Sequence, residues 1–176
     1  MNQVEPIRNK DDIKKMYDVL KKKSDRDYLL FKLAIHTGIR LTDLLNLKVK
    51  DVKMIDQDEI KSSWIESCAP AIKILLPNDL REEVRRFIEY NKLMDDHLLF
   101  QSIRTHKELS RQQAYRIIHH AAEELGLCHI GLTTLRKTFA YHAYQSGISI
   151  AIIQKYLGHQ TTQELSLIHI SEPTRQ

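Results

Sequence analysis

One stretch constrains the fold of this chain more than any other. It is the segment from Asp25 to Thr37, DRDYLLFKLAIHT, which is followed by Gly38. As a helix it carries apolar side chains on nearly every side, and Ser24 before it is a favourable N-cap. Gly38 is a natural helix end. A helix that is apolar nearly all round belongs in the middle of a domain, so the other elements must be arranged around it.

The remaining apolar patterns predict mostly helices. Asn9 can cap a helix that runs to the lysines at 21–23, an amphipathic helix begins near Asn78, and another follows Ser110. Between residues 52 and 76 the period changes to that of short strands, with turns near residues 56–57 and 67–70. The sequence therefore predicts a mainly α fold with a small antiparallel β-sheet (α+β), of about three strands, in a single domain.

The stretch from residue 132 to residue 163 carries the first functional signal. Arg136 lies in the first turn of one helix, and Leu157-Gly158-His159 ends the next helix, which Ser149 can cap. Ile152, Ile153, Tyr156 and Leu157 are expected to be its buried side, and Gly158 can take the left-handed conformation that ends it. Arg136 and His159 would then lie at the ends of adjacent helices, where their side chains can converge on one anion. Arginine offers a planar fork of donors that matches a phosphate. The alternative interpretation is a surface arginine and a helix-end histidine.

A second arginine, Arg40, follows Gly38 in HTGIRLTDLLNLKVKDV, residues 36–52. Here the chain resembles the tyrosine recombinases, or phage-type integrases. Their first box, roughly T-G-hydrophobic-R and then D/E-L and L, is matched by residues 37–40, 43–44 and 47. Their second box, H-x-L-R and then L-G-H, is matched by residues 133–136 and 157–159, with threonine in place of the first histidine. The resemblance runs from about Val4 to Glu164, and it is specific because both boxes occur in this order.

The resemblance implies a defined chemistry, site-specific DNA recombination and integration. In this family a tyrosine hydroxyl attacks a DNA phosphodiester, so that a 3′-phosphotyrosyl bond forms and a 5′-hydroxyl leaves. The covalent link conserves the bond energy, and no nucleotide cofactor is needed. Two arginines and histidine-type donors stabilise the negative charge of the transition state without a metal.

The family's site residues fall unevenly on this chain. Arg40 and Arg136 match the two arginines, and His159 matches the histidine of the L-G-H box, so these three are expected to bind the scissile phosphate in one basic pocket. Thr133 stands at the first histidine, where it can donate one hydrogen bond but cannot act as a general acid or base. A lysine is expected in the hairpin turn, but ESCAPA, residues 66–71, has none. Lys61 and Lys73 flank this turn and, with Thr133, are weaker candidates.

The nucleophilic tyrosine is expected about nine residues after the L-G-H histidine, where this chain has Ile168. That position lies in LSLIHISEPTRQ, residues 165–176, whose first eleven residues match the in-frame translation of a transposon-end sequencing adapter. We therefore expect a catalytic domain at residues 1–164, incomplete at its C-terminus, and a non-native tail at residues 165–176. A chain with this sequence is expected to be inactive, because isoleucine stands at the position of the nucleophile. Tyr141, Tyr144 and Tyr156 lie upstream on helix bodies and are not expected to replace it.

The composition of the chain limits the kinds of partner that it can bind. The net charge of +4 and the pI of about 9.0 permit a phosphate-rich partner. No apolar run has membrane-spanning length, and residues 1–15 lack the apolar core of a signal peptide. Cys68 and Cys128 have no metal-binding or redox spacing. We expect a cytoplasmic protein, encoded by a bacterium or a phage, that binds double-stranded DNA, forms a homo-oligomer on it, and needs no metal or other cofactor.

Two other interpretations remain open. The first is a non-catalytic DNA-binding protein of the same fold, such as a regulator or an excision accessory, which Thr133 and the lysine-free turn favour. The second is an unrelated helix-turn-helix protein, suggested by the helix–Gly–helix pattern between Leu135 and Leu157. That interpretation leaves the Arg40 box and the strand segment without a role.

Overall fold

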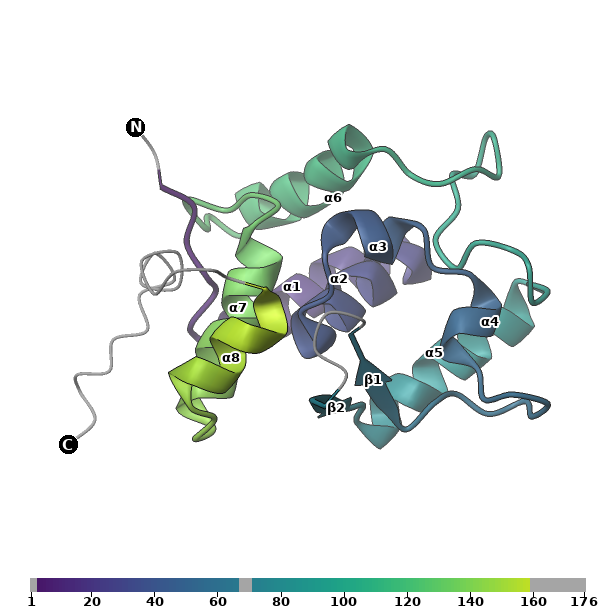
Figure 1. The fold of residues 1–176 in the computed structure, drawn as a ribbon. Helices are drawn as coiled ribbons and strands as arrows, with labels where there is room; N and C mark the ends of the chain where they lie inside the picture. The colour runs from purple at the N-terminus through teal and green to yellow at the C-terminus, as the bar shows by residue number, and fades with distance from the viewer. Residues whose placement is uncertain (1–2, 67–70, 159–176) are drawn as a thin grey trace.

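The computed structural model describes residues 3–66 and 71–158 of the chain. Helices and short strands follow one another in the order α1 (Lys10–Lys23), α2 (Asp25–Thr37), α3 (Leu41–Leu45), α4 (Val49–Val52), β1 (Ser63–Ile65), β2 (Lys73–Leu75), α5 (Asn78–Tyr90), α6 (Arg111–Glu124), α7 (Thr134–Gln145) and α8 (Ile150–Leu157). Figure 1 shows α2 inside the assembly, with the other helices around it and the two strands at one side. The mainly helical fold with a small antiparallel sheet is confirmed.

Helix α2 is the centre of this arrangement. Its ten buried residues include the whole run 27–35, and Leu30 and Phe31 have no exposed surface. It contacts α1, α3, α5 and α7. The Ser24 side chain accepts a hydrogen bond from the backbone N–H of Asp27, and Gly38 closes the helix in the left-handed conformation at φ 67°. The sequence prediction of a capped, central helix is confirmed at both ends.

The sheet is smaller than predicted. In the described part of the chain it has two strands, β1 and β2, which pair antiparallel with Trp64 opposite Ile74. The expected third strand is reduced to one isolated bridge between Lys53 and Ile60. Helix α4 takes up residues 49–52, and the exposed turn that follows has Asp56 at a positive φ of 58°, so no length of chain is left to extend the pairing. The turn predicted at residues 67–70 lies outside the described residues.

Two apolar clusters hold the elements together. The larger one surrounds α2, and the smaller one consists of Phe139 and Ala140 from α7 with Ile153, Tyr156 and Leu157 from α8. Trp64 of β1 packs against both clusters, so the hairpin joins them. The predicted inner face of α8 was wrong at Ile152, which is 47% exposed.

The N-terminal residues lie along α7 (Figure 1). The backbone N–H of Ile7 donates to Thr138 Oγ1 at 2.9 Å, and His142 Nε2 donates to the Ile7 carbonyl at 2.9 Å. Lys137 Nζ donates to the Val4 carbonyl at 2.7 Å. These three hydrogen bonds join α7 to the N-terminal segment.

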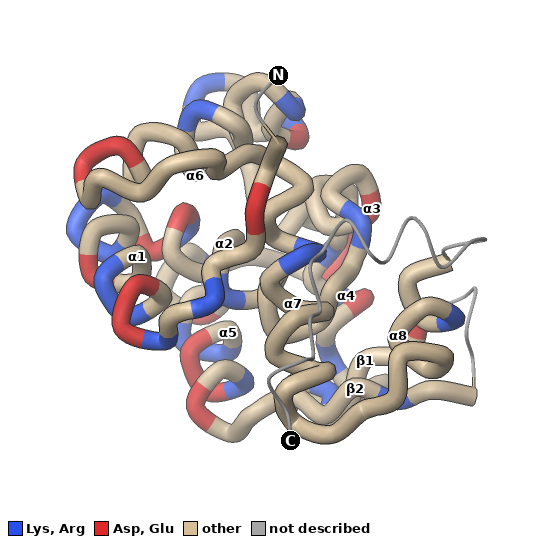
Figure 2. The backbone as a smooth tube through the Cα atoms, turned by 90° about the vertical axis from the view of Figure 1, so that its left-hand side faces the viewer, with Lys and Arg blue, Asp and Glu red and all other residues tan. Residues whose placement is uncertain are grey.

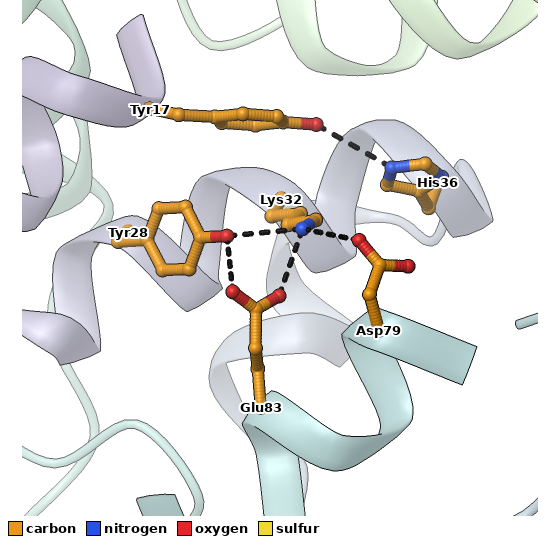
Figure 3. A network of polar contacts seen from close by, with 6 residues as sticks. All are labelled: Tyr17, Tyr28, Lys32, His36, Asp79 and Glu83. Atoms are coloured by element: carbon orange, nitrogen blue, oxygen red, sulfur yellow. Dashed lines mark hydrogen bonds and ion pairs between the residues drawn. The ribbon is translucent and has the colours of Figure 1, made fainter. Parts of the chain in front are cut away.

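A polar network crosses the interface between α2 and α5 (Figure 3). The Lys32 ammonium donates to Glu83 at 2.8 Å and to Asp79 and the Tyr28 hydroxyl at 3.0 Å. Its side chain is only 8% exposed. Burial alone would lower the pKa of Lys32, but the hydrogen bonds that its ammonium donates to Glu83, Tyr28 and Asp79 outweigh burial and raise this pKa above its ordinary value. Lys32 is therefore a buried cation that its partners keep charged.

Replacing Lys32 by methionine should destabilise the fold. The substitution keeps an apolar stem but leaves the half-buried Glu83 without its cation, and removing one partner of a buried pair typically costs about 3–5 kcal/mol. Urea denaturation should show a lower free energy of unfolding. Lys50→Met is the matched control, because Lys50 pairs with Asp96 at the surface, where their side chains are 53% and 84% exposed. Equal unfolding curves for the two variants would contradict a structural role for the buried network.

Candidate active site

Arg136 lies in the first turn of α7, and its guanidinium spans two other elements. Nε donates to the Gly38 carbonyl at 2.8 Å, and Nη2 donates to the Leu157 carbonyl at 3.1 Å. These carbonyls belong to the ends of α2 and α8, where helices leave acceptors without an intrahelical partner. The side chain therefore joins the ends of two helices and is held in one orientation by both.

Arg40 approaches the same place from the turn before α3. It is the extended residue that precedes this helix, and its side chain is exposed. Its Nη2 atom lies 2.8 Å from the position that a Cβ on Gly158 would occupy. Gly158 has the predicted left-handed conformation, at φ 76°. Arg40 and Arg136 thus both reach the Leu157–Gly158 segment, although they are far apart in the sequence.

Gly38 explains how α7 comes so close to the end of α2. A Cβ on Gly38 would lie 2.5 Å from the Phe139 ring, a distance that real Cβ atoms do not tolerate. Its φ of 67° also favours glycine. Because Phe139 is one turn along from Arg136 on α7, the packing of this ring on Gly38 brings the guanidinium to the Gly38 carbonyl.

Two acidic residues complete the site, and our sequence interpretation gave them no role. Glu66, which follows β1, is only 6% exposed, and within the described residues its Oε2 atom is buried with no hydrogen-bond partner. Asp43 of α3 is exposed. Both line an open groove of about 590 Å³ between α3 and β1, together with Lys61 and Trp64. The one sequence signal for Glu66 was its place at the start of the predicted turn.

The charges around Glu66 oppose one another. Burial raises the pKa of the Glu66 carboxyl, and the negative charge of Asp43 raises it further. The guanidinium charges of Arg136 and Arg40 lower this pKa, but the net result is a value above the ordinary one. The polar Nε1 of Trp64 also lowers this pKa, although it forms no hydrogen bond of ordinary geometry. Glu66 is therefore a buried acid whose pKa depends on the charges of both arginines.

The weaker site candidates predicted from the sequence are Thr133, Lys61 and Lys73. Thr133 is exposed, directly before α7, and its side chain makes no capping hydrogen bond. Lys61 lines the same groove as Glu66, whereas Lys73 is exposed on β2, opposite Ile65. His159 lies outside the described residues, as does position 168, so the structure places neither of them.

The upstream tyrosines have structural surroundings. Tyr156 is 1% exposed, and its hydroxyl donates to the Thr37 carbonyl at the end of α2. Tyr144 packs against the smaller apolar cluster. The Tyr141 ring lies under the guanidinium of Arg8, 5.6 Å from its centroid. These contacts agree with the interpretation of all three as parts of helix bodies.

The two helices at the site also differ in charge from the helices on the other side of the molecule. Helix α7 carries Arg136 and Lys137, α8 carries Lys155, and neither contains a carboxylate. Helices α1 and α5 carry both signs, as Figure 2 shows. In residues 3–66 and 71–158 no helix is long and apolar enough to cross a membrane, and no group of three histidine, cysteine or acidic residues is placed to hold a metal ion.

Comparison with known proteins shows the family of the chain. The model of the phage integrase family matches residues 8–167. The probable integrase/recombinase YoeC of Bacillus subtilis (strain 168) is 40% identical over 176 residues, which cover 99% of this chain and 94% of YoeC. The tyrosine recombinase XerA of Pyrococcus furiosus is 30% identical over 157 residues, which cover 87% of this chain but 54% of XerA.

Among solved structures, that of the site-specific recombinase XerH bound to palindromic difH substrate has a TM-score of 0.73 at 20% identity. The match covers 97% of this chain and 51% of XerH. The chain thus spans nearly all of YoeC and about half of XerA and XerH. With a family model that matches most of its length and a relative that is 40% identical almost from end to end, this chain belongs to the phage integrase family.

Proposed function

We propose that this chain is the catalytic domain, residues 1–164, of a tyrosine recombinase that cuts and rejoins double-stranded DNA at specific sites. Arg40, Arg136 and His159 bind the scissile phosphate, and the protein acts as a homo-oligomer on the DNA. One observation carries the proposal. The two arginines reach the same Leu157–Gly158 segment, which directly precedes His159.

The surroundings of the arginines support a role in phosphate binding. Helix-end carbonyls orient the Arg136 guanidinium, and such preorganised donors can stabilise charge that develops during a reaction. Helices α7 and α8 carry no carboxylate that would repel a phosphate backbone. In the reaction, the bond from phosphorus to the 5′-oxygen breaks as the tyrosyl bond forms, and the 5′-oxygen leaves with a proton.

The nucleophile is the part of the chemistry that this sequence lacks. Ile168 stands where the family's tyrosine is expected, and isoleucine has no nucleophilic atom. We infer that a polypeptide of this sequence binds DNA but forms no covalent intermediate with it. Thr133 and the lysine-free turn favour the second candidate, a non-catalytic DNA-binding protein of the same fold.

Replacing Arg136 by alanine should weaken DNA binding more than it weakens folding. A mobility-shift titration over salt should show a log–log slope smaller by about one, the value for one lost phosphate contact. Arg111→Ala removes the same charge from an exposed position in the first turn of α6, and its binding should stay close to that of the unmodified chain. If Arg136→Ala reduced stability and affinity equally, Arg136 would be a structural residue only.

A nicked suicide duplex tests the missing nucleophile. The chain should give no covalent adduct on a denaturing gel, while Ile168→Tyr would restore the expected nucleophile to its predicted position. An adduct with the unmodified chain would show that an upstream tyrosine acts instead. In that case the assignment of position 168 would be wrong.

Gly158→Ala tests the contact with Arg40. The substitution adds a Cβ that must displace the guanidinium, and it places alanine at a positive φ, which costs about 1 kcal/mol. Gly126→Ala is the matched control, because Gly126 has a similar φ of 72° with nothing within 4 Å of its Cβ position. Urea denaturation should show a similar loss of stability for both variants, whereas DNA binding should weaken only in Gly158→Ala. Equal DNA binding by the two variants would argue against Arg40 at the site.

A further inference from the structure

Glu66 is unusual among the charged groups of this site because it is buried. It has 6% of its surface exposed, and its Oε2 atom has no hydrogen-bond partner in the described part of the chain. An ionised carboxylate in such a place normally has hydrogen bonds or a direct ion pair that offsets the loss of water. The interactions that favour the ionised form of Glu66 are the attraction of the Arg136 and Arg40 guanidinium groups and, after them, the Trp64 side chain.

The charge balance of the site changes when an anion enters. In the empty site, two guanidinium groups face two carboxylates, Glu66 and Asp43, so the formal charges cancel when both acids are ionised. A phosphodiester brings one further negative charge. Asp43 is exposed, so water screens it, whereas Glu66 is shielded from water and responds more strongly to a new charge nearby.

We propose that Glu66 is a proton-linked positioning residue, which balances Arg40 and Arg136 in the empty site and takes up one proton when a DNA phosphate binds. The inference rests on the proposed function, because it requires the arginines to hold a phosphate. Glu66 need not touch the phosphate. It acts through the two guanidinium groups, which its carboxylate attracts in the empty site and releases to the phosphate once it is protonated.

The charges around Glu66 make its carboxyl the group that should take up the proton. The charged groups that act on Glu66 are Arg40 before α3, Asp43 of α3 and Arg136 of α7. Lys61 and Asp51 line the same groove. Both burial and Asp43 already hold the pKa of Glu66 above its ordinary value, and the two arginines are what lower it. A phosphate that neutralises the arginines removes this lowering, so the carboxyl gains a proton.

The test compares the chain with Glu66→Gln, which imitates the protonated acid. Binding of a short DNA duplex should strengthen as the pH falls from about 8 to 6, and one linked proton contributes at most about tenfold per pH unit. Glu66→Gln should bind more tightly than the unmodified chain at pH 8 and should lose that part of the pH dependence. Glu59→Gln removes the same charge from an exposed position before the same hairpin, and it should keep the pH dependence.

Calorimetry in buffers of different ionisation enthalpy measures the proton directly. The unmodified chain and Glu59→Gln should take up more protons on binding the duplex than Glu66→Gln does, by up to one per site. Histidines contribute equally to all three proteins and cancel in the comparison. Equal proton uptake in the three proteins, or an equal change in both variants, would overturn the proposal.

A measurement on the unmodified chain tests the proposal even if the Glu66→Gln variant fails to fold. In a carbon-13 NMR titration, the Glu66 carboxyl should lose its proton at higher pH with the duplex bound than without it, and an unchanged titration would overturn the proposal.

Failure of the proposed function would give a different result, in the DNA binding of Arg136→Ala. If Arg136→Ala binds the duplex as well as the unmodified chain does, the arginines are not the phosphate site. If Arg136→Ala weakens binding but Glu66→Gln leaves proton uptake intact, only the role of Glu66 is wrong.

Discussion

The rest of the structure depends on the C-terminal end of α2, at Thr37 and Gly38, which we call the joint. Its last carbonyls carry the partial negative charge of a helix C-terminus and need donors from elsewhere. The Tyr156 hydroxyl donates to the Thr37 carbonyl, and the Arg136 guanidinium donates to the Gly38 carbonyl. The Phe139 ring fits against Gly38 because that residue has no Cβ. One left-handed turn thus receives both α7 and α8, and it sets the position of the arginine.

The same joint explains how two cations can be held near each other before any anion arrives. Like charges repel, so an empty pair of guanidinium groups needs opposing charge. Carbonyl dipoles at two helix ends accept hydrogen bonds from Arg136, and the Glu66 carboxyl, which follows β1, interacts electrostatically with both arginines. Under the proposed function, an incoming phosphate therefore competes with groups of the protein, as well as with water, for the two arginines.

Local signals allowed much of this structure to be predicted. The caps at Ser24 and Ser149 and the left-handed Gly158 depend on nearest neighbours, so the sequence was sufficient to find them. The strand count was wrong because short strands depend on partners elsewhere in the chain. Glu66 was missed for a similar reason. Its charged neighbours are Arg40, Asp43 and Arg136, and nothing in the residues around Glu66 along the chain indicates them.

The hydrogen bonds of the joint link residues very distant along the chain. Arg136 and Gly38 are 98 positions apart, and Tyr156 and Thr37 are 119 positions apart. Contacts of such separation close large loops, and they form after local ones. During synthesis, α1 and α2 can pair as soon as both have emerged from the ribosome, whereas the arginine pair has to wait until α8 is made. The hydrogen bond from Arg136 to the Leu157 carbonyl, which fixes the guanidinium at the end of α8, is therefore among the last contacts of the fold that can form.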